Sequence, residues 1–91
     1  MTDIPALAAA LATDRYTHTA LADGTGVVLD IEGMHILTLN ETGEFLVAAM
    51  LAGAVDEPDL VARLVAGFEV EEPQAREDVS SFLVELSQYL A

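Results

Sequence analysis

GVVLDIEGMHILTLN, residues 26–40, is the stretch that decides the fold of this chain of 91 residues. Side chains alternate between two faces from Val27 to Glu32, which predicts a β-strand. Gly33 comes next, and a glycine with positive φ closes a tight two-residue turn at Glu32-Gly33. A second strand is predicted over residues 34–39, so the stretch as a whole is expected to form a β-hairpin.

The second strand of this hairpin carries apolar side chains on both faces. Met34 and Ile36 lie on one face, and His35, Leu37 and Leu39 lie on the other. Such a strand is either covered on both sides or exposed for a partner to cover. Two expectations follow. Either the helices and the N-terminal segment bury both faces within the monomer, or the strand is left free to bind.

Composition limits the classes of partner. Sixteen acidic residues stand against three arginines, and the formal net charge is -13. A field of this sign repels phosphate backbones and anionic lipid, so we expect no nucleic acid and no membrane surface among the partners. A basic or neutral protein or peptide is favoured instead. The absence of cysteine excludes disulfides and thiolate metal sites and suits a cytoplasmic protein.

The first half of the chain is expected to be mostly β-structure. Residues 1–15 predict a short Ala-rich helix or a loosely held arm, and their apolar run is too short and lacks the basic start of a signal peptide or a membrane span. Residues 16–21 suit a strand, and the two glycines within residues 23–26 suit a turn. A three-stranded antiparallel meander is therefore predicted over residues 16–40.

Helical spacing replaces strand alternation after Asn40, which is a good N-cap. Residues 41–91 are expected to form three helices. The first ends at Gly53, the second begins at the cap residue Asp56 and ends at Gly67, and the third runs towards the C-terminal end.

Strands followed by helices predict one α+β domain over residues 1–91. A three-stranded antiparallel sheet followed by three helices is typical of a small winged helix-turn-helix, here with the wing before the helices. DNA binding is disfavoured, because Arg63 and Arg76 are the only basic residues in the second and third helices, among an excess of acids.

Chemistry-bearing motifs are sparse, and we predict no catalytic residues, no cofactor and no metal site. His18 and His35 have no metal-ligand spacing around them, and Ser80-Ser81 lies inside a predicted helix without a nucleophile elbow. An acyl-carrier role is disfavoured for the same reason, since its modifiable serine is needed at a helix start. The sequence indicates a protein that binds rather than one that catalyses.

Two segments resemble the PqqD-like family. Residues 32–43, EGMHILTLNETG, are similar to its strand that ends in Leu-Asn-Glu and leads directly into a helix, and residues 70–86 are similar to its last helix. The resemblance covers residues 26–90. Two features differ: Ile36-Leu37-Thr38 replaces the aromatic pair of many relatives, and the N-terminal arm has no counterpart.

The resemblance implies a peptide chaperone, or recognition element, in the biosynthesis of ribosomally made natural products. Such a module binds the leader of a precursor peptide and presents it to a modifying enzyme such as a radical SAM enzyme, a cyclodehydratase or a leader protease. The leader is expected to add as a strand to the edge of the third strand, beside the third helix. Carried over by position, the peptide-binding residues are Met34, His35, Ile36, Leu37 and Thr38 on the strand and, as an exposed helix flank, Arg76, Val79, Phe82, Leu83 and Leu86.

A second reading of the same edge is a contact between two copies. An acidic adaptor or antitoxin-like protein would form a homodimer through the apolar N-terminal arm and the edge strand. Both readings depend on an apolar strand edge without the lysines or prolines that usually protect one.

Overall fold

The computed structural model describes residues 3–90. A three-stranded antiparallel sheet is preceded by one helix and followed by three, which confirms the predicted α+β class. The elements, in chain order, are α1 (Ile4–Leu11), β1 (Tyr16–Ala20), β2 (Gly26–Asp30), β3 (His35–Leu39), α2 (Glu41–Leu51), α3 (Glu57–Phe68) and α4 (Glu72–Leu90).

The hairpin between β2 and β3 forms, but its turn differs from the prediction. Asp30 pairs with His35, so four residues rather than two make the connection. The positive φ lies at Met34, at 57°, and not at Gly33. Gly33 is needed for a different reason: a Cβ added there would lie 2.7 Å from Oδ2 of Asp30. Met34 therefore belongs to the turn, and β3 starts one residue later than predicted.

Asp30 organises this turn. Its Oδ1 accepts hydrogen bonds from the backbone N–H groups of Glu32 at 3.1 Å and Gly33 at 2.9 Å. Nε and Nη2 of Arg15 donate to the two carboxylate oxygens, each at 2.9 Å. The Arg15 guanidinium, followed by the Gly33 N–H, lowers the pKa of Asp30 to about 2. One buried carboxylate thus ties the hairpin to the segment that enters β1.

The helix starts follow the predicted caps. Oδ1 of Asn40 accepts from the Gly43 N–H at 2.8 Å, and Oδ1 of Asp56 accepts from the Asp59 N–H at 2.9 Å. The predicted end of α3 at Gly67 is wrong, because the helix continues to Phe68 and its C-cap, Glu69, takes the left-handed conformation.

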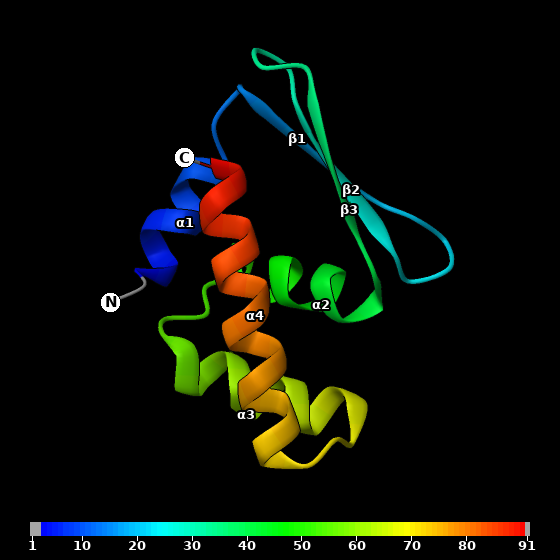
Figure 1. Ribbon diagram of the computed structural model, residues 1–91, viewed down its shortest axis with the longest axis vertical. Coiled ribbons are helices and arrows are strands. Elements are labelled where there is room, and N and C mark those ends of the chain that lie inside the picture. The colour runs from blue at the N-terminus through cyan, green and yellow to red at the C-terminus, as the bar shows by residue number, and fades with distance from the viewer. Residues whose placement is uncertain (1–2, 91) are drawn as a thin grey trace.

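The helices cover one face of the sheet and leave the other open. Figure 1 shows α1, α2 and α3 arranged along α4, with the β2–β3 turn at the top of the view standing clear of the helices. Val28, Leu37 and Leu39 point into the core between sheet and helices. The helix α1 packs against α2, α4 and β1, not against the open face. The expectation that the helices bury one face of the hairpin and the N-terminal segment the other is therefore wrong for the second face, where Leu29 and Ile36 stay exposed.

Candidate functional site

The strand β3 is an edge of the sheet, since the strand order is β1-β2-β3. The direction in which the backbone N–H and C=O groups of β3 point follows from the hydrogen bonds that β2 makes with β1 on its other side. There the Ile31 N–H donates to the Arg15 carbonyl at 2.9 Å, and the Leu21 N–H donates to the Thr25 carbonyl at 2.8 Å. In an antiparallel pair the bonded and non-bonded positions alternate, so the odd-numbered residues of β2 direct their N–H and C=O groups towards β1.

The even-numbered residues of β2 consequently face β3, where Asp30 pairs with His35 and Val28 pairs with Leu37. The backbone of His35 and Leu37 is committed to β2. By the same alternation, Ile36 and Thr38 direct their N–H and C=O groups away from the sheet. These four groups form a row to which another strand can bond.

The side chains of β3 divide between the two faces. Leu37 and Leu39 are buried on the inner face, and His35 shares that face but is exposed at the start of the strand. Ile36 and Thr38 are exposed on the open face. Ile36 pairs with Leu29 on the open face, and Ile31 and Met34 continue the apolar surface at the turn. We call Leu29, Ile31, Met34 and Ile36 the outer patch; their exposed fractions are 37%, 50%, 79% and 67%.

The predicted helix flank is only partly exposed. Val79, Leu83 and Leu86 are 0%, 1% and 0% exposed, so the prediction that they form an open wall is wrong. They follow one another at helical spacing, and this spacing turns all three towards the core of the protein. Phe82 lies beside this stripe and is half-buried at the surface.

Phe82 instead belongs to a groove between β3 and α4. One hollow of about 230 Å³ is lined by Thr38, Leu39, Asn40, Gly43, Phe82 and Glu85. An adjoining hollow of about 220 Å³ shares Asn40, Gly43, Phe82 and Glu85 and adds Thr42, Asp78 and Ser81. A Cβ at Gly43 would lie 3.3 Å from Cε1 of Phe82, so the ring packs closely over the start of α2. We call this surface the β3–α4 groove.

The sequence prediction missed several residues of the β3–α4 groove. Asp78 and Glu85 lie four residues before and three after Phe82, and Ser81 lies three residues after Asp78 and four before Glu85. Spacings of three and four residues place helix side chains on one face. Reading the helix face around Phe82, rather than its most apolar stripe, would have found them.

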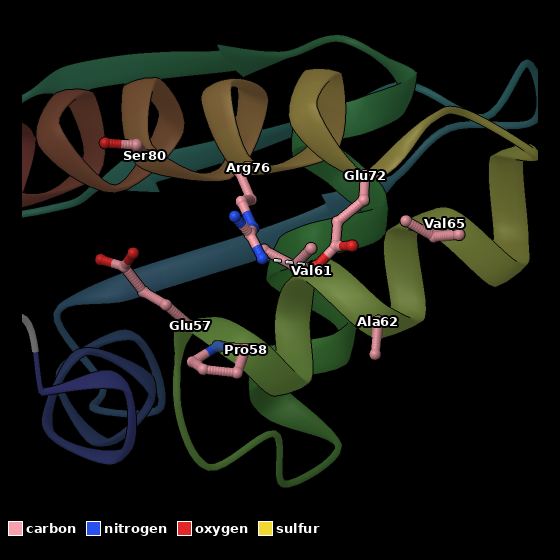
Figure 2. A pocket seen from close by; sticks show the side chains of 8 residues that line it. All are labelled: Glu57, Pro58, Val61, Ala62, Val65, Glu72, Arg76 and Ser80. Carbon is pink, nitrogen blue, oxygen red and sulfur yellow. Dashed lines mark hydrogen bonds and ion pairs between the residues drawn. The ribbon is translucent and has the colours of Figure 1, made fainter.

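Arg76 lies on the other side of α4. It lines a separate hollow of about 700 Å³ between α3 and α4, over Pro58, Val61 and Val65. Figure 2 shows the Arg76 side chain beside Glu72, to which Nη2 donates at 2.7 Å. The structure therefore separates Arg76 from β3 and from the β3–α4 groove, and the prediction that it lines the same wall as Phe82 is wrong.

Tyr89 fixes the end of α4 against the hairpin. Its hydroxyl donates to the His35 carbonyl at 2.9 Å and approaches the Val28 carbonyl at 3.2 Å. Burial raises the pKa of the Tyr89 phenol, which keeps it protonated and able to donate. Since Phe82 lies near Leu39 and Tyr89 near His35, α4 runs antiparallel to β3 along the groove.

The charges around the β3–α4 groove are all negative. The three arginines of the chain are paired with carboxylates elsewhere: Arg15 with Asp30 at 2.9 Å, Arg63 with Asp59 at 3.0 Å and Arg76 with Glu72 at 2.7 Å. Among residues 3–90, those that line the groove include the carboxylates of Asp78 and Glu85 and no cation.

His18, which the sequence left without a role, bonds through Nε2 to Oε1 of Glu44 at 2.7 Å and joins β1 to α2.

Residues 3–90 contain no cluster of three or more side chains suited to a metal ion. Within the same residues, no helix has both the length and the apolar character needed to cross a bilayer.

Comparison with known proteins gives this arrangement a family. The family model described as "Coenzyme PQQ synthesis protein D (PqqD)" matches residues 25–89, and the chain belongs to this family. Its fold also matches a solved structure, "Lasso peptide synthetase B1 complexed with the leader peptide", with a TM-score of 0.71 and 23% sequence identity. The match covers 85% of this chain and 88% of that chain. No curated protein matches.

Proposed function

We propose that this protein is a non-catalytic module that captures the leader segment of a ribosomally synthesised precursor peptide by strand addition to β3 and presents it to a modifying enzyme. The observation that carries the proposal is the free edge: Ile36 and Thr38 direct their backbone donors and acceptors outwards beside a groove. Membership of the PqqD family and the likeness in fold to a synthetase bound to its leader peptide support the proposal.

Strand addition uses this edge in two ways. Main-chain hydrogen bonds to Ile36 and Thr38 supply affinity that depends little on the peptide sequence. Side chains of the added strand then alternate between the open face, beside the outer patch, and the β3–α4 groove, beside Phe82. Sequence preference would come from these two surfaces.

The partner enzyme would be a radical SAM enzyme, a cyclodehydratase or a leader protease, which the family resemblance implies. A module without its own catalytic constellation contributes by raising the local concentration of the precursor at that enzyme. A cytoplasmic location is part of the same proposal, because precursor peptides of this kind are made by ribosomes there.

The test is to titrate isotope-labelled protein with the leader peptide of a precursor encoded beside its gene and to follow backbone amide shifts. We expect the largest shifts at the outward N–H groups of Ile36 and Thr38 and at Phe82. The proposal fails if none of these amides responds at sub-millimolar peptide.

Proline substitution makes the test specific to the edge. Thr38→Pro removes an outward N–H and leaves the β2–β3 bonds in place, so the fold is expected to persist while peptide binding is lost. Ala20→Pro is the matched control: Ala20 directs its N–H away from β2 on the opposite edge, by the same alternation.

A homodimer through β3 is the second candidate, and the exposed outer patch favours it. It predicts that the amide shifts of Ile36 and Thr38 depend on protein concentration without peptide and that sedimentation gives twice the monomer mass. Thr38→Pro would then produce a monomer.

A further inference from the structure

Resting on this proposed function, we propose that the leader is recognised by a two-sided pattern: an apolar side chain against Ile36 and a lysine or arginine at an odd spacing of one or three residues, held over Phe82 by Glu85 and Asp78. The ligand is thus a basic peptide strand, and the β3–α4 groove selects it by the positive charge of this side chain.

The odd spacing follows from the pairing of an added strand. A peptide residue opposite Ile36 points to the open face, because paired residues in a sheet share a face. A peptide residue opposite Leu37 or Leu39 points to the other face, where the groove is lined by Leu39, Phe82 and Glu85. The two positions are one or three residues apart in the peptide, whichever direction it runs.

The apolar side chain of the peptide would contact an apolar surface that the open face already presents. Ile36 and its partner Leu29 are 67% and 37% exposed on the open face, and Thr17 follows beyond Leu29 on β1. An apolar side chain added next to Ile36 extends this row and removes apolar surface from water.

The basic position follows from charge complementarity. The groove holds two carboxylates, those of Asp78 and Glu85, and every arginine of the chain is paired elsewhere. Asp78 accepts one hydrogen bond, from Nε2 of Gln74 at 2.9 Å, which leaves its negative charge uncompensated.

Phe82 selects a long cationic side chain over a short one. The ring is half-buried between Asp78 and Glu85 on the same helix face. The methylene stem of lysine or arginine can cover such a ring while its charged end reaches the carboxylates, and a cation near the ring face is itself favoured. An acidic leader residue at this position would meet only like charge.

The experiment is a selection of random twelve-residue peptides, displayed on their encoding messenger RNA, against the immobilised full chain. We expect enriched peptides to carry lysine or arginine one or three residues from an apolar residue. The double variant Asp78→Asn with Glu85→Gln should lose this basic preference, with enriched peptides binding about 2- to 5-fold more weakly per carboxylate removed.

The matched control changes the same charge elsewhere. Glu57→Gln with Glu71→Gln removes two carboxylates that do not line the β3–α4 groove, and it should keep the basic preference. The proposal is overturned if wild-type protein enriches apolar peptides without the basic residue, or if the preference survives Asp78→Asn with Glu85→Gln. If the wild-type protein enriches peptides no better than the Thr38→Pro variant does, strand addition to β3 is itself overturned. Failure of the proposed function can therefore be distinguished from failure of the basic preference.

Discussion

The two faces of the β2–β3 hairpin have similar apolar side chains and opposite fates. On the inner face Val28 and Leu37 are 0% and 9% exposed, and on the open face Leu29 and Ile36 are 37% and 67% exposed. The difference lies in what covers each face, because the core residues of α2 and α4 pack against the inner face. Apolar content alone thus does not distinguish a residue that stabilises the fold from one available to a partner.

The largest effect on stability is expected from a substitution on the inner face of the hairpin. Leu37→Ala leaves a cavity under the helices and should lower the free energy of unfolding by about 2–5 kcal/mol. Urea denaturation followed by circular dichroism measures the loss. A loss as small as that of an exposed substitution would show that Leu37 is not part of a packed core.

The next effect concerns the carboxylate under the hairpin turn. Asp30 has its pKa lowered from 3.8 to about 2 in the folded state, so its contribution is present above pH 4 and is lost as the pH falls from about 4 to 2. Asp30→Asn should reduce stability at neutral pH and flatten the dependence on pH in this window. Denaturation at a series of pH values tests the slope, and an unchanged slope would contradict the role of the Arg15 pair.

Tyr89→Phe tests whether the end of α4 holds the hairpin in place. It removes the hydroxyl that donates to the His35 carbonyl, so we expect a loss of about 0.5–1.5 kcal/mol and faster amide hydrogen exchange in β3. Unchanged exchange would mean that the tyrosine does not hold the hairpin against the helix.

The smallest effect on stability is expected on the open face. Ile36→Ser should change the free energy of unfolding by within about 0.5 kcal/mol, because the side chain has few neighbours to lose. Leader binding, measured by calorimetry, should weaken although the fold does not. A loss of stability as large as that of Leu37→Ala would mean that the open face is covered in solution, as in a dimer.

Local residue chemistry made much of the fold predictable. The caps Asn40 and Asp56, the strand alternation and the helical spacing act within a few residues, and they indicated the meander and the helices after it. The turn was mispredicted because Gly33 was expected to supply the positive φ. In the structure Met34 has the positive φ, and Gly33 lacks a side chain because the Asp30 carboxylate approaches it closely. That contact depends on Arg15 and the turn together.

The candidate site divides in the same way. Sequence alone determined that β3 is largely apolar, that it contains neither lysine nor proline, and that the chain as a whole is strongly acidic, since these are properties of residue types along the chain. Tertiary structure decided that Val79, Leu83 and Leu86 are buried, that Arg76 faces α3, and that Glu85 and Asp78 join Phe82 beside the strand. The reason is geometric: spacing places residues on a common helix face, and only packing against other elements decides which face meets the core and which meets the free edge of β3.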